Sequence, residues 1–210
     1  MTRMTYLLRP RPALRSVVRL AAALLLNGLA LPAQPHELGF TVGRLARQEL
    51  PPLTLGGGAV LQIQYGRRIA GGAGAALFGD LTMLASPLRE VSSNNPRTTR
   101  DVASLYVTPG LRVKVAPQAK ASPYVTFGGG WAWYEQSTER LDGRPNEAPR
   151  HAHRLALMWG GGVDVRVRRW LAIRIDARDF YTGSPAFNIP ISSRRHNVAV
   201  SGGAVLRWGR

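Results

Sequence analysis

The chain has no cysteine among its 210 residues, and it has only 12 acidic residues against 28 lysines and arginines. Without cysteine, neither a disulfide framework nor a thiolate metal site is available. The 23 glycines and 15 prolines suit a protein of many strands and turns better than a helical bundle. The length is sufficient for one domain with a sizeable core. The net charge of +16 predicts contact with a polyanion.

The first 33 residues contain no acidic side chain and are typical of a Sec-type signal peptide. An apolar run over 20–31 is too short to span a bilayer as a helix, although a short membrane anchor is the alternative. We expect cleavage after Ala30 or Ala33, which leaves 34–210 as the mature domain. Cleavage removes five positive charges and lowers the net charge from +16 to +11. A secreted chain meets polyanions other than nucleic acid, so we expect no nucleic-acid partner.

Residues 155–181 contain the clearest pattern, in which apolar and polar side chains alternate with a period of two. A helix would repeat near 3.6 residues, so the pattern predicts two long strands. A three-residue turn at 168–170 joins them and pairs Val167 with Leu171. The same register places Asp164 opposite Arg174, which predicts an ion pair between them.

The same alternation predicts eight strands, and the lengths of their connections alternate between long and short. The long connections are 48–55, 85–100, 137–152 and 183–195, and the short ones are 67–71, 116–122 and 168–170. This order is typical of an eight-stranded antiparallel up-and-down transmembrane β-barrel, an all-β fold with long loops outside and short turns inside. A proline at position 109 predicts a bulge or bend. The predicted strands are 38–47, 58–66, 72–84, 101–115, 123–136, 155–167, 171–181 and 196–208.

One set of alternating side chains is apolar and the other carries charge. In a membrane barrel the apolar set meets lipid and the charged set faces the interior, where the charges must pair. A lipocalin-like soluble carrier, the alternative, needs an apolar interior. The side chains predicted to form an interior charge network are Asp80, Arg112, Lys114, Asp164, Arg166, Arg174, Asp176, Arg178 and Arg207.

Large aromatic residues lie toward the predicted strand ends or in the adjoining turns. Such residues form girdles at membrane interfaces. Glycine clusters at 128–130, 160–162 and 202–203 indicate strand curvature or close backbone approach. The predicted interfacial aromatics are Trp131, Trp133, Trp159, Trp170, Tyr181 and Trp208.

Motifs for cofactor or metal chemistry are weak, so we expect no cofactor, no metal site and no catalytic residues. The glycines of 71–80 are followed by no helix, which disfavours a dinucleotide site. His151 and His153 lack a nearby third ligand and are more typical of a solvated loop than of a metal site. His196 and Ser201 fall on opposite faces of one strand, and no nucleophile–base pair follows from spacing.

The segments PYVTFGGGWAW (123–133) and WGGGVDVRVRRWLAIRIDARDFYTG (159–183) resemble the later strands of bacterial outer-membrane β-barrels of the OmpA/OmpX/OmpW-like type. The resemblance covers about 36–210. It implies location in a Gram-negative outer membrane and insertion by the barrel-assembly machinery. The machinery recognises an aromatic residue near the end of the chain, a role that falls to Trp208. We expect no peptidoglycan-binding domain after the barrel.

The function predicted from these features is a non-enzymatic structural or surface-interaction role, with outer-membrane lipids as partners. A small pore, a lipid-modifying enzyme and a soluble carrier remain alternatives. Loop arginines are expected to meet lipopolysaccharide phosphates or to be merely solvated. These arginines are Arg89, Arg97, Arg100, Arg140, Arg144, Arg150, Arg194 and Arg195.

Overall fold

The computed structural model describes residues 35–184, 187–188 and 194–209. The chain divides into two units, Met1–Ala33 and Gln34–Arg210. The predicted signal peptide and both cleavage positions lie outside the described residues. Much of the predicted loop 183–195 does too.

The second unit consists of strands and their connections. The described residues contain no helix with the length and hydropathy to cross a membrane. The strands are β1 (His36–Leu45), β2 (Gln48–Leu50), β3 (Leu53–Leu55), β4 (Gly58–Gly71), β5 (Ala75–Ser93), β6 (Asp101–Val115), β7 (Ala121–Gln136), β8 (His151–Arg166), β9 (Leu171–Gly183) and β10 (Arg194–Trp208).

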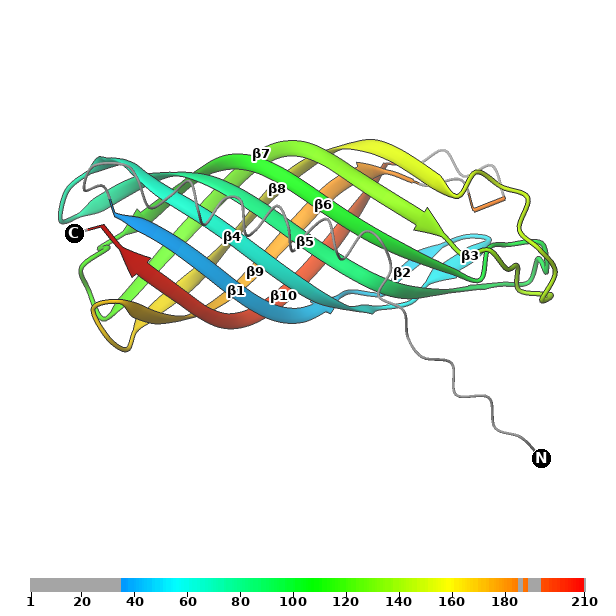
Figure 1. Cartoon of the computed structure of the whole chain (residues 1–210), viewed down its shortest axis with the longest axis horizontal. Coiled ribbons are helices and arrows are strands. Elements are labelled where there is room, and N and C mark those ends of the chain that lie inside the picture. The colour runs from blue at the N-terminus through cyan, green and yellow to red at the C-terminus, as the bar shows by residue number, and fades with distance from the viewer. Residues whose placement is uncertain (1–34, 185–186, 189–193, 210) are drawn as a thin grey trace, which may run out of the picture. The chain divides into compact units, whose positions relative to one another are not determined.

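Eight of the strands form a closed antiparallel ring (Figure 1). Each long strand pairs with the next along the chain, and β1 closes the ring by pairing with β10 from His36–Trp208 to Leu45–Ala199. The eight-stranded up-and-down prediction is therefore confirmed. Closure leaves no unpaired edge in the ring, which is the condition for a sheet that contacts lipid.

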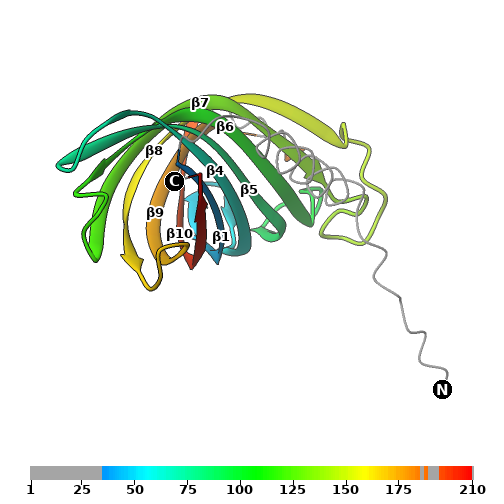
Figure 2. The ribbon, with the colours of Figure 1, turned by 60° about the vertical axis from the view of Figure 1, so that its left-hand side comes forward.

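The two ends of the barrel differ in their connections. Residues 72–74, 116–120 and 167–170 make short turns at the end where β1 begins and β10 finishes, the end that comes forward in Figure 2. At the other end lie the connections 46–57, 94–100 and 137–150, together with the end of β9 and the start of β10. We call these the turn end and the loop end.

Several predicted boundaries were wrong. The predicted loop 48–55 contains the hairpin β2–β3, and β3 adds to β5 through Leu53–Ser93 and Leu55–Val91. The predicted loop 85–100 is strand as far as Ser93, because a bulge between Ser86 and Arg89 lets β5 continue beside β6. The turn predicted at 67–71 is strand, because a second irregularity, between Arg68 and Ala70, keeps β4 paired with β5.

Pro109 causes no bulge, one of the two irregularities predicted there. Pairing of β6 with β7 stops after Val107–Trp131 and resumes at Gly110–Gly128 in the same register. Pro109 remains opposite Leu81 of β5. The missing N–H therefore falls where the ladder to β7 is interrupted, which is how a strand tolerates proline.

The outer surface of the ring is apolar and the inner surface is polar. Outward residues such as Val125, Phe127 and Ile175 are more than 60% exposed, whereas inward Arg112 and Lys114 are fully buried. A smaller apolar cluster fills the loop end of the lumen, where Leu84, Tyr106 and Phe180 are fully buried. An apolar exterior around a charged interior is the distribution expected of a barrel whose solvent is lipid.

The glycine clusters allow close approach of neighbouring strands. A Cβ on Gly203 would lie 2.0 Å from the Phe40 carbonyl oxygen, and one on Gly130 would lie 2.1 Å from that of Val107. A Cβ on Gly129 or Gly202 would meet its nearest atom at 3.6 Å. The inward glycines of these clusters therefore have no room for a side chain, as curvature in a narrow barrel requires.

We predict that Gly203→Ala lowers the free energy of unfolding by about 1–3 kcal/mol, because the added methyl would displace the backbone of β1. Gly72→Ala is the control, since a Cβ there meets no atom within 4 Å. Urea unfolding in detergent micelles, followed by tryptophan fluorescence, measures both. Equal midpoints for the two variants would contradict the packing role of Gly203.

Candidate functional site

The largest concentration of chemistry lies inside the barrel, where charged side chains converge from most of its strands. The strand period aims alternate residues at the lumen, so polar residues far apart in sequence meet there. The charged members of this lumen network are Glu37, Asp80, Arg112, Lys114, Asp164, Arg174, Asp176, Arg178 and Arg207.

Asp164 of β8 holds three cations. Its carboxylate lies 2.7 Å from Arg174 Nε, 2.5 Å from Lys114 Nζ and 3.0 Å from an Arg207 terminal nitrogen. The register places Asp164 opposite Arg174, so the pair lies where the sequence-derived register placed it. A carboxylate with three cationic neighbours compensates the cost of leaving water.

Glu37 of β1 is the second centre of the network. Its carboxylate oxygens lie 2.7 Å from Lys114 Nζ, 2.9 Å from Arg112 Nη1 and 3.2 Å from Arg207 Nε. Arg112 also stacks over the Phe78 ring, with its guanidinium carbon 4.7 Å from the ring centroid. Glu37 thereby links β1 to β6 and β10 across the lumen.

Asp176 of β9 is the centre of a second group of side chains, most of which are uncharged. It accepts hydrogen bonds from Arg178 Nε at 2.9 Å, Ser201 Oγ at 2.5 Å, Tyr124 Oη at 3.0 Å and Gln62 Nε2 at 3.1 Å. Together these bonds connect β9 with β10, β7 and β4.

Gln64 of β4 joins the two groups. Its amide nitrogen donates to Asp80 at 2.6 Å, and its oxygen accepts from Arg174 and, at 2.8 Å, from Arg178. An amide suits this position because it donates on one side and accepts on the other. The lumen network is thus continuous.

Sequence analysis missed Glu37, Gln62, Gln64 and Tyr124. The first predicted strand began at Leu38, one residue after Glu37, although Glu37 shares the inward set with Thr41 and Gly43. Gln62 and Gln64 belonged to the polar set of their predicted strand, and this position indicated that they face the interior. Arg166 differs from the other predicted members, because its guanidinium bonds to none of the described residues.

The predicted interfacial aromatics lie on the outer surface. Trp131 and Trp170 are half-exposed or more, and Trp133 and Trp208 are partly covered. Trp159 lies near the middle of β8, but its ring is 6.2 Å from Tyr181 and 5.8 Å from His196. These three rings form an aromatic patch toward the loop end of β8–β10.

Within this patch, His196 Nδ1 lies 2.6 Å from Asp179 Oδ2. The pairing places a carboxylate beside an imidazole, as in the base of a hydrolase, but catalysis also needs a nucleophile. Ser201 points into the lumen, where its hydroxyl donates to Asp176. Among the described residues no hydroxyl is bonded to the His196 ring.

The histidines 151 and 153 stand at the start of β8. His153 packs edge-on against Trp133 with ring centroids 6.3 Å apart. No group of three or more histidine, aspartate or glutamate side chains in the described part of the chain could hold a metal ion.

The predicted loop arginines divide into different environments. The prediction was wrong for Arg89, which is buried and donates to the carbonyl oxygens of Gly56 and Ala46. Arg195 is also buried, over the Phe187 ring. Ion pairs with nearby carboxylates hold Arg100, Arg140 and Arg150.

A closed eight-stranded barrel with an apolar exterior and a charge-filled lumen has the architecture of the small bacterial outer-membrane barrels. Solved structures of this class match the chain. Neisserial surface protein A matches with a TM-score of 0.51 and 13% identity, covering 84% of this chain and 97% of that chain. OprG of Pseudomonas aeruginosa matches with a TM-score of 0.55 and 9% identity, covering 85% and 98%.

No protein-family model and no curated protein matches the chain. The structural matches confirm the fold that was predicted from the alternating strands and their connections, and they agree with the resemblance to OmpA/OmpX/OmpW-like barrels.

We predict that Asp164→Asn lowers the free energy of unfolding by about 3–5 kcal/mol, because three buried cations lose their shared carboxylate. Glu139→Gln is the control. It breaks an exposed ion pair with Arg100 and should change stability by about 1 kcal/mol or less. Urea titration of both variants in the same detergent measures the difference. A loss below 1 kcal/mol for Asp164→Asn would mean that the network contributes little stability.

Proposed function

We propose that the protein is a plugged outer-membrane barrel that anchors its loops at the bacterial surface, without enzymatic activity. The observation that carries this proposal is the lumen network, a continuous set of paired charges filling a narrow barrel with an apolar exterior. Side chains normally fill an eight-stranded barrel. The side chains that remain accessible to a binding partner then lie at the two ends of the barrel.

Each alternative function meets an opposing observation. A small pore requires an open lumen, whereas Glu37, Arg112, Asp164 and Arg174 bond to one another across it. A lipocalin-like carrier requires an apolar interior and a polar exterior, the reverse of this arrangement. A lipid-modifying enzyme requires a nucleophile beside the His196–Asp179 pair.

The proposed assembly route is Sec export, removal of 1–33 after Ala30 or Ala33, and insertion by the barrel-assembly machinery. Trp208, at the end of β10, is the aromatic residue proposed as its recognition signal. Its ring stacks on His36 of β1, with centroids 5.6 Å apart. The recognised strand is therefore also one of the two that close the barrel.

The loop end is the proposed outer surface. Arg97 and Arg144 lie there in exposed turns, and their guanidinium groups bond to no described residue. Guanidinium groups form paired hydrogen bonds with phosphate. We propose these two, and not the buried Arg89, as the loop arginines that contact lipopolysaccharide phosphates.

Insertion and orientation are testable because the chain lacks cysteine. We predict that Glu147→Cys at the loop end reacts with a membrane-impermeant maleimide on intact cells. Gly72→Cys at the turn end should react only after the outer membrane is permeabilised. Both positions are exposed. Labelling of Gly72→Cys alone on intact cells would invert the orientation, and recovery of the protein in the soluble periplasm would overturn the proposed location.

Current recording in planar bilayers tests whether the lumen network blocks the passage of ions. We predict no sustained conductance steps from the purified protein, because the lumen network spans the barrel. Bilayers with detergent alone are the control. Steps that scale with protein concentration would favour the small pore instead.

A further inference from the structure

The basic excess of the chain is concentrated at the turn end. Residues 67–74, 116–120 and 166–170 contain six basic residues and no acidic one. Residues 46–57, 87–101, 135–151 and 183–195, at the loop end, contain nine basic and seven acidic residues. A field of one sign at one end attracts anions there, whereas charges of nearly equal number and opposite sign largely cancel.

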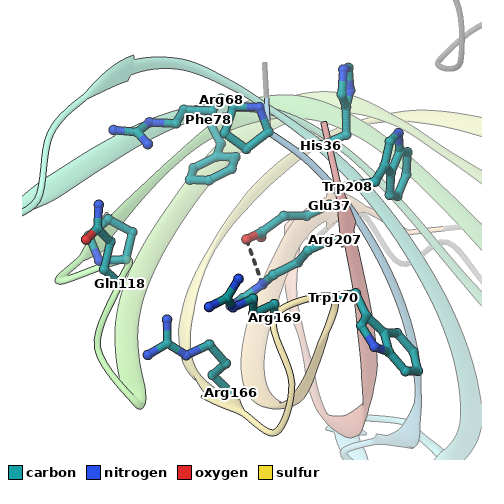
Figure 3. Close-up of a pocket in the computed structure, with 12 residues that line it drawn as sticks. His36, Glu37, Arg68, Phe78, Gln118, Arg166, Arg169, Trp170, Arg207 and Trp208 are labelled. Carbon is teal, nitrogen blue, oxygen red and sulfur yellow. Dashed lines mark ion pairs between the residues drawn. The ribbon is translucent and has the colours of Figure 1, made fainter. Parts of the chain in front are cut away.

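A cavity of about 790 Å³ opens at this end. Arginines from three strands and one turn contribute to its lining: Arg68 of β4, Arg166 of β8, Arg169 of the turn after β8, and Arg207 of β10. Figure 3 shows Arg68 with Phe78 on one side of Glu37 and Arg166 with Trp170 on the other, while Arg169 lies beside Arg207. We call this cavity the turn-end mouth.

Among the described residues that line the turn-end mouth, Glu37 is the only acidic one, and its carboxylate already forms ion pairs. Its carboxylate contacts Arg112, Lys114, Arg174 and Arg207. It therefore has no capacity to neutralise the arginines above it. The floor of the mouth is a compensated ion-pair network, and its rim carries uncompensated charge.

Arg166 and Arg169 are the uncompensated groups. Their guanidinium groups form no hydrogen bond or ion pair with the described residues, although both line the same cavity. The mouth thus presents guanidinium groups that have no partner among the described residues, and such groups complement an oxyanion.

We propose that the turn-end mouth binds a phosphate-bearing anion, held by the guanidinium groups of Arg166 and Arg169 with Arg68 opposite. Planar guanidinium forks match the geometry of phosphate oxygens and can bind two at once. The site goes beyond the anchoring role of the loops and does not depend on it. In the proposed orientation the mouth opens to the periplasm.

Titration of the purified protein with pyrophosphate by calorimetry tests the proposal. We expect binding that Arg166→Gln/Arg169→Gln weakens at least tenfold. Arg44→Gln/Arg47→Gln removes the same charge from exposed positions at the loop end of β1 and should leave the affinity within twofold. Arg166→Lys/Arg169→Lys keeps the charge but loses the fork, and should bind with intermediate affinity.

The slower migration after boiling, typical of a closed barrel, checks that each variant is folded. Absence of pyrophosphate binding to the folded wild type would overturn the proposal. Equal weakening by the mouth and loop-end variants would also overturn it, because binding would then follow net charge alone. Loss of loop-end surface contact would leave this result unaffected, so the two proposals fail separately.

The source of the phosphate is resolved by repeating the titration in nanodiscs. A site for a soluble phosphate ester, the ligand expected for side chains that line a cavity, keeps its affinity in phosphatidylcholine and phosphatidylglycerol discs. A site for a lipid headgroup is already occupied in phosphatidylglycerol discs and loses its affinity for pyrophosphate there.

Discussion

The structure depends on the pairing of charges inside a barrel too narrow to hydrate them freely. A charge transferred from water must meet an opposite charge and satisfied hydrogen bonds, or its burial is costly. Four carboxylates and five cations each have an oppositely charged partner in the lumen, where Glu37 and Asp164 each contact three or more cations. Because the partners come from different strands, the same pairs that satisfy the charges also fix which strands face one another.

The exterior follows the opposite rule. Lipid offers no hydrogen bonds, so each strand must satisfy its backbone within the ring and present apolar side chains outward. The small inward glycines complete the arrangement, because they let the twisted strands approach at the places where charged side chains do not fill the space. Alternate residues of each strand thus face two different environments, lipid outside the barrel and the charge network inside it.

Most of the fold was predictable because a period of two is a strong local signal. The hairpin 155–181 defined its own register, and with it the position of Asp164 opposite Arg174. The errors came from non-local effects. Arg89 was assigned to a loop on the polarity of its neighbours, but pairing with β6 and β3 extends β5 past it. Gln64 is an uncharged residue whose role depends on which partners lie across the lumen, and no spacing reveals that.

The site at the turn end illustrates the same limit. In sequence, Arg68 and Arg169 fell in or beside predicted turns, where an arginine is usually a solvated group, and Arg166 was assigned to the interior charge network. Only closure of the ring brings them to one opening, above a floor whose carboxylate is already saturated. The basic character of the whole chain was evident from composition, but its concentration at one end required the topology.

The length of β5 has a consequence for how the loops are displayed. Its 19 residues extend for about 60 Å along the strand, and even at a tilt of about 45° this is about 40 Å along the barrel axis. The lipid-facing band of such barrels is only about 25 Å tall. At the loop end this surplus pairs with β3 on one side and β6 on the other. The hydrogen-bonded sheet is therefore taller than the band that lipid has to cover, and the loops begin from paired strands.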